Sequence, residues 1–187
     1  MAGDLFQNFT ITRALRMRLQ PLILLEGVSI DRPGLYLFSG DALLDVLRHY
    51  LLNDTRKVIY LPWDEGEKEV GKNLMGLGEV IPSSDELKQA VLKWKEREGR
   101  LILFGRSWIG TEELDKYLAE NPEVGLILVK GVSVFSGPGE IEDKGAVLSR
   151  LRRISRNRRV GVVVCREPDI DRYSKLFDRV LEPGQVQ

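Results

Sequence analysis

The segment from Gly66 to Asn73, GEKEVGKN, has residues that could bind a phosphate group. It comes within one residue of the phosphate-binding pattern G-x-x-x-x-G-K-[ST], with both glycines and Lys72 at the correct spacing. In a working loop, backbone N–H groups surround the phosphates, the lysine reaches the outer phosphates, and the hydroxyl holds Mg²⁺. The loop must also lead into a helix N-terminus, where the dipole favours an anion. A functional loop at this place would make the protein a nucleotide-binding enzyme.

Several features of this segment argue against a phosphate site. Asn73 replaces the hydroxyl residue, and the carboxylates of Glu67 and Glu69 would stand beside a negatively charged phosphate. The following residues 74–78 read LMGLG, and their two glycines disfavour the helix that the pattern needs. We therefore interpret the segment as an acidic, solvated turn after a strand. An ATPase with a non-standard nucleotide site is kept as an alternative.

The other reactive side chains predict neither a catalytic group nor a metal site. His49, the only histidine, lies in a predicted helix among apolar residues, and Cys165, the only cysteine, closes an apolar run. A packing role suits both residues better than catalysis, because no second histidine or cysteine accompanies them. The sequence also lacks any spacing typical of a zinc site. We expect no catalytic residue, no metal and no cofactor.

Arginines are concentrated in one segment, SRLRRISRNRRV, which begins at Ser149. Such a density could neutralise several phosphates of a nucleic acid. A solvated or ion-paired helix face is favoured, because Glu140, Glu142 and Asp143 are available as partners and no aromatic residues are interleaved to stack on bases. A nucleic-acid-binding accessory protein is kept as an alternative. Its contacts would be Arg150, Arg152, Arg153, Arg156, Arg158 and Arg159.

Short apolar runs alternate with helical patterns along the chain. Runs of this length, without polar alternation, are typical of strands buried on both faces of a parallel sheet. We predict helices over 41–52, 83–98, 111–121 and 144–157, with capping signals at Ser83 and Thr111. The expected fold is therefore a three-layer α/β/α domain with a mainly parallel sheet. The predicted strands are 34–39, 57–62, 100–105, 124–129, 160–165 and 179–183.

Composition sets further expectations. The 187 residues include 28 Lys+Arg and 28 Asp+Glu, so no global charge draws the chain to nucleic acid or to a membrane. We expect a single domain over 1–187, with an irregular or short-helical lead-in over 1–33 and a possible helix at 12–20. A single cysteine and the absence of a long apolar run near the N-terminus favour a cytoplasmic protein. Charged residues at 30% favour a thermophilic source.

The order of these segments resembles the RecA-like ATPase core, especially its archaeal RadA/RadB and KaiC-like branches. The resemblance covers residues 24–183 and depends on the character of the segments rather than on rare motifs. It implies that the strand at 160–165 lies between those at 35–39 and 124–129, with 57–62 beyond the latter. The segments that carry it are 24–40, LLEGVSIDRPGLYLFSG; 57–67, KVIYLPWDEGE; 100–118, RLILFGRSWIGTEELDKYL; 124–135, VGLILVKGVSVF; and 144–168, KGAVLSRLRRISRNRRVGVVVCREP.

The chain departs from this family where the phosphate loop is expected. In the family, the strand matching GLYLFSG is followed by the glycine-lysine loop, whereas here Gly40 is followed directly by the helical segment that starts with Asp41. Ser39 and Gly40 remain, but the lysine, the hydroxyl and most of the loop are absent. Asp41 and Asp45 suit a helix N-terminus but would oppose a triphosphate.

Two further family positions are changed. Lys130 stands where the family has its Mg²⁺-organising aspartate, and a lysine cannot ligate Mg²⁺. Either Asp64 or Glu65 could match the family's water-activating glutamate. The family's polar sensing residue follows a later strand, and no residue of Cys165-Arg166-Glu167 matches it securely. We therefore expect a vestigial nucleotide site in which Lys130 pairs with Asp41, Asp45, Asp64 or Glu65. A solvent-exposed Lys130 is the alternative. The residues of this vestigial site are Ser39, Gly40, Asp41, Asp45, Glu65 and Lys130.

These departures predict a catalytically inactive RecA-like protein. Its expected role is that of an interaction partner or regulator, with a recombinase or a KaiC-like ATPase as the expected target. The expected partner is a protein, any contact with nucleic acid should be weak, and no membrane contact is expected.

Overall fold

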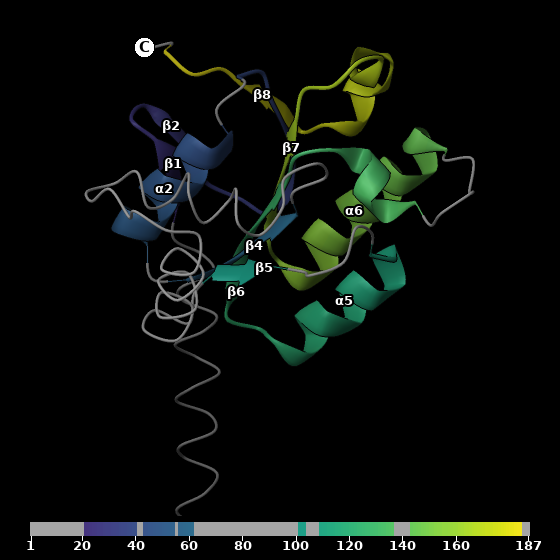
Figure 1. Ribbon diagram of the computed structural model, residues 1–187, viewed down its shortest axis with the longest axis horizontal. Helices are drawn as coiled ribbons and strands as arrows, with labels where there is room; N and C mark the ends of the chain where they lie inside the picture. Colours follow the sequence, from purple (N-terminus) through teal and green to yellow (C-terminus); the bar gives the residue numbers. More distant parts are fainter. Residues whose placement is uncertain are drawn as a thin grey trace, which may run out of the picture.

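A six-stranded sheet forms the centre of the protein in the computed structural model (Figure 1). The structure describes residues 21–40, 43–54, 56–61, 101–103, 109–136 and 143–184. All neighbouring strands are parallel, in the order β5-β4-β6-β7-β3-β8. The strands are β3 (Gly34–Phe38), β4 (Lys57–Leu61), β5 (Leu101–Leu103), β6 (Val124–Val129), β7 (Gly161–Cys165) and β8 (Arg179–Leu181).

This sheet confirms the predicted α/β class and the predicted strand order. β7 pairs with β6 on one side and with β3 on the other, and β4 lies beyond β6. The central strands β3, β6 and β7 are buried along their whole length, which explains why their sequences are apolar without alternation. Each strand lies within about two residues of the range that its apolar run predicts.

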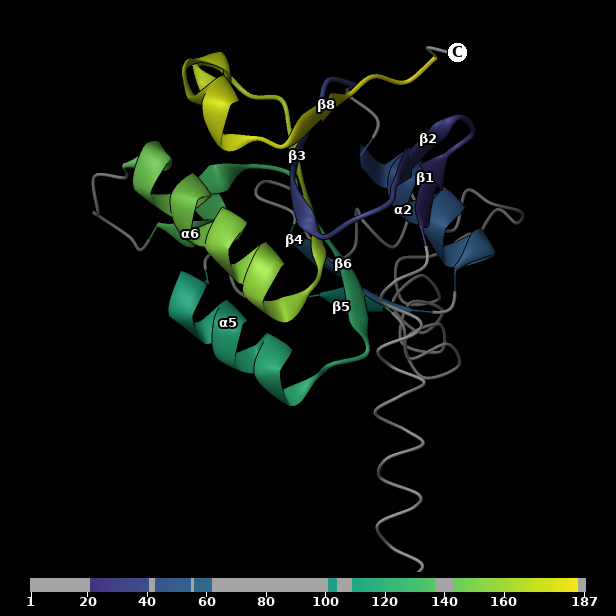
Figure 2. The ribbon, with the colours of Figure 1, turned by 180° about the vertical axis from the view of Figure 1, so that it is seen from behind.

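Helices and turns cover the two faces of the sheet. One face is covered by α5 (Thr111–Glu120), α6 (Lys144–Arg158) and the short 3-10 helix η1 (Val132–Phe135), with a second 3-10 segment, η2 (Ile170–Leu176), beside them (Figures 1 and 2). The other face is covered by α2 (Leu43–Asn53) and by a small β-hairpin. The result is the expected three-layer arrangement.

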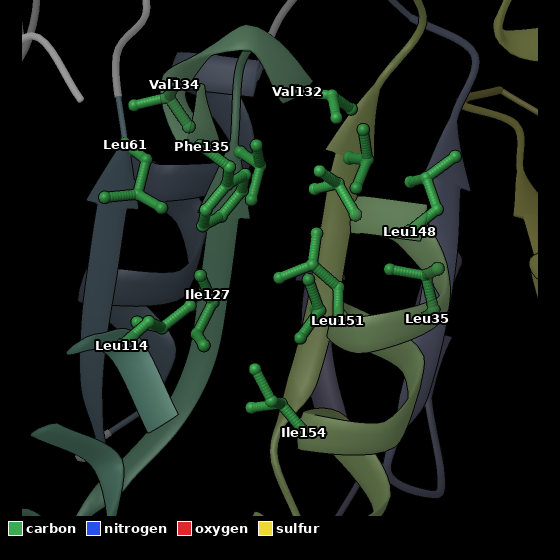
Figure 3. Close-up of a cluster of buried hydrophobic side chains, with 14 of the residues drawn as sticks. Leu35, Leu61, Leu114, Ile127, Val132, Val134, Phe135, Leu148, Leu151 and Ile154 are labelled. Atoms are coloured by element: carbon green, nitrogen blue, oxygen red, sulfur yellow. The ribbon is translucent and has the colours of Figure 1, made fainter. Parts of the chain in front are cut away.

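Each face has its own hydrophobic core. Along β3, Leu35 and Leu37 point to the core under α5 and α6, while Tyr36 and Phe38 point to the core under α2. Figure 3 shows the first of these cores, with Leu148, Leu151 and Ile154 of α6 directed at the sheet. Because both faces bury apolar side chains, the strands are fixed in register from both sides.

The described helices confirm the patterns read from the sequence. α6 begins after Asp143, whose carboxylate accepts a hydrogen bond from the Ala146 N–H at 3.2 Å, and it ends at Arg159 in the left-handed conformation, with φ 56°. An aspartate cap commonly begins a helix, and a residue in the left-handed conformation commonly ends one. The helices predicted over 12–20 and 83–98 lie outside the described residues. No helix in the described ranges combines the length and hydrophobicity that spanning a bilayer requires.

A β-hairpin over residues 22–30 corrects the expected irregular or short-helical lead-in for that part of 1–33, and residues 1–20 lie outside the described residues. β1 (Leu22–Leu25) and β2 (Val28–Ile30) pair antiparallel through a tight turn in which Gly27 has φ +75°. The hairpin packs closely on the sheet, because a Cβ at Gly161 would overlap the Ile30 Cδ1. A larger residue at the start of β7 would therefore require the Ile30 side chain to move.

Candidate functional site

The candidate site is the carboxyl edge of the sheet, where the parallel strands β3, β4, β6 and β7 all end. Open α/β sheets place their ligands at this edge, in the crevice where the strand order reverses. The residues that follow the strand ends there include Ser39, Gly40, Lys130 and Glu167. The topology thus places the predicted positions 39–40 and 130 of the vestigial site at the same edge, on either side of β7.

Ser39 and Gly40, which follow β3, make close contacts with the C-terminal segment. The Ser39 N–H and hydroxyl donate to the Leu181 carbonyl at 3.0 and 3.2 Å. A Cβ at Gly40 would lie 2.9 Å from both the Phe38 ring and the Pro183 side chain. The Cys165 thiol lies 3.5 Å from the Gly40 carbonyl. The polar groups of Ser39 are thus directed at β8 rather than into the space above the sheet.

The connection from β3 to α2 is short. β3 ends at Phe38 and α2 begins at Leu43, so only residues 39–42 separate the strand from the helix. The phosphate-binding pattern needs about twice that length between a strand and the helix that receives the phosphates. Asp41 lies outside the described residues, and Asp45 is exposed in the first turn of α2.

Lys130 directly follows β6, which ends at Val129. Its N–H donates to the Leu61 carbonyl of β4 at 3.1 Å, so the backbone still follows the sheet, and its side chain is half-buried. Of its predicted partners, Asp41, Asp64 and Glu65 lie outside the described residues. The ion pair of Lys130 with one of these carboxylates or with Asp45 therefore stays a prediction.

Glu167, which follows β7, holds three elements together at this edge. Its carboxylate is 14% exposed, accepts the Val132 N–H of η1 at 2.9 Å and pairs with the Lys144 ammonium of α6 at 2.7 Å. Sequence reasoning considered this position only as an unmatched sensing residue and did not predict its contacts. The only signal was a carboxylate two residues beyond a buried strand. Because an ammonium and an N–H already occupy this carboxylate, its geometry suits holding η1 and α6 in place.

The described residues offer no cluster of three or more histidine, cysteine or carboxylate side chains that could hold a metal ion. Cys165 is buried at the end of β7, as a packing role requires. His49 is half-buried in α2.

The arginine segment forms α6 and its end, and half of its guanidinium groups are paired with carboxylates. Arg152 and Arg156 both donate to the Asp178 Oδ1, at 3.1 and 3.0 Å, and Arg158 donates to Asp115 of α5 at 2.8 Å. The expected partners were Glu140, Glu142 and Asp143. Of these, Asp143 caps the N-terminus of α6. Glu140 and Glu142 lie outside the described residues. Ion pairing is confirmed for these arginines, but the partners come from distant segments.

Three other arginines of the cluster, Arg150, Arg153 and Arg159, are exposed. Within the described residues, none of the three has a carboxylate within the 4.0 Å of an ion pair. Nucleic-acid contact by the cluster stays a prediction.

Asp178 is held in its ionised form at the amino end of β3. Burial alone would raise the pKa of its carboxyl, but the Leu35 N–H, at 2.9 Å from Oδ2, and the two arginines outweigh burial and lower the pKa below its usual value. The pKa of Asp115 is likewise lowered, chiefly by its hydrogen bond with Arg158. Both carboxylates therefore act as fixed negative charges for α6.

A buried ion pair of Arg56 and Asp54 lies at the amino edge of the sheet, next to the end of α2. Arg56 is 5% exposed, and it donates to Asp54 through its backbone N–H, Nε and terminal nitrogen, at 2.8, 2.9 and 2.5 Å. The same guanidinium donates to the Pro21 carbonyl at 3.2 Å. A Cβ at Gly125 would lie 2.9 Å from the Arg56 side chain. This group joins the start of β1 to the core and lies away from the carboxyl edge.

No family model and no curated protein matches the sequence. Solved structures do match its fold. A KaiC-like protein from the archaeon Pyrococcus horikoshii aligns with a TM-score of 0.57 and 10% identity over 84% of this chain and 76% of its own. The ATPase domain of G40P aligns with a TM-score of 0.53 and 9% identity over 81% and 69%.

A DnaB-like replicative helicase also aligns, with a TM-score of 0.48 and 9% identity over 71% of this chain, which spans 38% of the helicase chain. The topology and the alignments with the KaiC-like protein and with G40P define the fold class. The protein has the three-layer α/β/α fold of the RecA-like ATPase core. At such low identity the likeness concerns the fold alone.

Proposed function

We propose that this chain is a RecA-like protein that has lost ATP hydrolysis and acts through contact with a protein partner. The main observation in support is the short connection between β3 and α2, which consists of residues 39–42. In a hydrolysing RecA-like core, the phosphate loop occupies this connection, and here there is room for about half of it. The Ser39 hydroxyl, which donates to Leu181, is engaged within the fold.

Lys130 supports the same conclusion. It follows β6, the position at which the family places the aspartate that organises Mg²⁺. An ammonium there carries the wrong charge for a cation and cannot serve as a ligand. A short phosphate connection and a reversed charge at the metal position are separate changes. Together they would remove both the phosphate-binding and the metal-binding parts of phosphoryl transfer.

The competing proposal is hydrolysis at GEKEVGKN, which lies outside the described residues. ATP turnover by the full chain should be measured with Mg²⁺, alongside a Lys72→Ala variant and a Lys130→Ala variant of matched charge change. We expect no turnover above the buffer rate from any of them. Turnover that Lys72→Ala abolishes and Lys130→Ala preserves would establish the GEKEVGKN site and overturn the proposal.

The proposed partner is another RecA-like ATPase, either a recombinase or a KaiC-like protein. A protein with the same fold that lacks the catalytic residues can bind such an enzyme without competing for its nucleotide. The test is to add the chain at increasing concentration to an ATPase of this class from the same organism. We expect a saturable change in the partner's turnover and a direct complex in sedimentation. If neither is found with any such ATPase of that organism, the regulatory role is wrong even if the chain itself proves inactive.

A further inference from the structure

The outer helical layer carries separated charges. α5 and α6 lie side by side on one face of the sheet, joined by the pair of Asp115 and Arg158 (Figures 1 and 2). α6 is basic from Lys144 to Arg158 and contains no acidic residue, whereas acidic residues outnumber Lys116 along α5. The chain has no net charge, so this separation is local.

The charged side chains of both helices reach solvent. Arg150 and Arg153 of α6 are exposed, as is Arg159 directly after it, and on α5 Glu112 and Glu120 are exposed. Complementary potentials of this kind select a partner and accelerate its approach. The α5–α6 face, defined as the exposed sides of these two helices, therefore fits a partner that presents an acidic helix beside a basic one.

We propose that the partner of the α5–α6 face is a second copy of this chain. Both helices connect parallel strands of one sheet, so they run in the same general direction. A two-fold axis parallel to them and between the two molecules places α5 of each copy over α6 of the other. Each acidic helix then meets the basic helix of the other copy, and this contact occurs twice in the dimer, as an isologous interface requires. This inference does not depend on the proposed loss of hydrolysis.

A nucleic acid is the less suitable occupant of the same arginines. Phosphates approaching Arg153 would pass close to Asp115 of α5, because the charge of Arg153 already acts on that carboxylate. A polyanion would be repelled by the acidic helix α5, whereas the basic helix α6 of a second copy would be attracted to it.

The test is to reverse charges on the face and to measure self-association of the full chain by sedimentation. Measurements at roughly 20 mM and 300 mM salt compare weak with strong screening of the charges. We expect a reversible dimer whose association constant falls about tenfold or more at the higher salt. Arg150→Glu/Arg153→Glu and, separately, Glu112→Lys/Glu120→Lys should each reduce self-association at least about tenfold. Arg32→Glu/Lys175→Glu, which reverses two exposed charges on other elements, is the matched control and should leave it unchanged.

Two experiments that restore opposite charges across the interface decide the proposal. A mixture of the two reversed variants should form a one-to-one complex, and a single chain with all four reversals should self-associate again, because each acidic helix again faces a basic one. Circular dichroism should show that every variant is folded. A wild type that stays monomeric in low salt, or reversals that fail to rescue each other, would overturn the proposal. A monomer that binds single-stranded DNA and loses it in Arg150→Glu/Arg153→Glu would assign the face to nucleic acid instead.

Discussion

Replacing Asp178 with alanine should destabilise the fold strongly. Its carboxylate is 13% exposed and accepts three hydrogen bonds, from the Leu35 N–H, Arg152 and Arg156. A bond from a buried N–H to a charged acceptor contributes about 1.5–3 kcal/mol. The two arginines are 31% and 55% exposed, so each pair adds only about 0.2–1 kcal/mol. We expect Asp178→Ala to cost about 2–5 kcal/mol in the free energy of unfolding.

Urea and thermal unfolding measure this cost. A loss of that size should lower Tm by roughly 5–20 °C in a chain of this length. Asp171→Ala is the matched control, because Asp171 also pairs with an arginine, Arg166, but both side chains are exposed, at 68% and 49%. It should leave Tm near the wild-type value. If the two variants were equally stable, the inferred role of Asp178 in joining β3, β8 and α6 would be wrong.

The lowered pKa of Asp178 adds a pH dependence with a defined sign. Its folded-state pKa lies below the unfolded value of about 3.9, so its charge stabilises the fold fully above that value. The contribution is lost as the pH falls through the lower, folded pKa. The stability difference between wild type and Asp178→Asn should therefore be constant from about pH 5 to 7 and shrink below about pH 4. A difference that grows on acidification would contradict this assignment.

Three further changes test other parts of the structure. Gly161→Ala should cost about 1–3 kcal/mol in unfolding free energy, because the added Cβ meets Ile30 of the hairpin, whereas Gly110→Ala, with open space around it, should cost less than about 1 kcal/mol. Glu167→Ala should cost about 1–3 kcal/mol in urea unfolding, since it strands the Val132 N–H, and Glu167→Gln should cost less. Lys130→Ala should cost about 2–4 kcal/mol if the predicted carboxylate pair is present, and a negligible cost would show that Lys130 points into solvent.

The sheet was predictable because its strands are buried on both faces. β6 and β7 appear in the sequence as unbroken apolar runs, and such runs have few other interpretations. Their order in space came from the resemblance to the RecA-like core, since apolar runs alone do not say which strands pair. The hairpin at 22–30 was missed because its strands are short, although Ile23 and Ser29 do alternate with buried neighbours.

The contacts of the candidate site were less predictable. Asp178 and Leu35 are 143 residues apart, so nothing local in the sequence indicated their hydrogen bond. The arginines of α6 were expected to pair with nearby carboxylates, but helix packing brought Asp115 and Asp178 within reach instead. Positions at strand ends could be placed, because parallel strands end at one edge. Side-chain partners could not, because they depend on how distant segments pack.

Thermal unfolding of the full chain with and without Mg-ATP tests the central claim most directly, because it detects binding at any site that folding creates. The connection of residues 39–42 and the ammonium of Lys130 predict an unchanged Tm up to millimolar nucleotide. A ligand at a hundred times its Kd would add about 2.7 kcal/mol to the free energy of unfolding, or roughly 5–10 °C in Tm. A saturable rise of that size that requires Mg²⁺ would contradict the account.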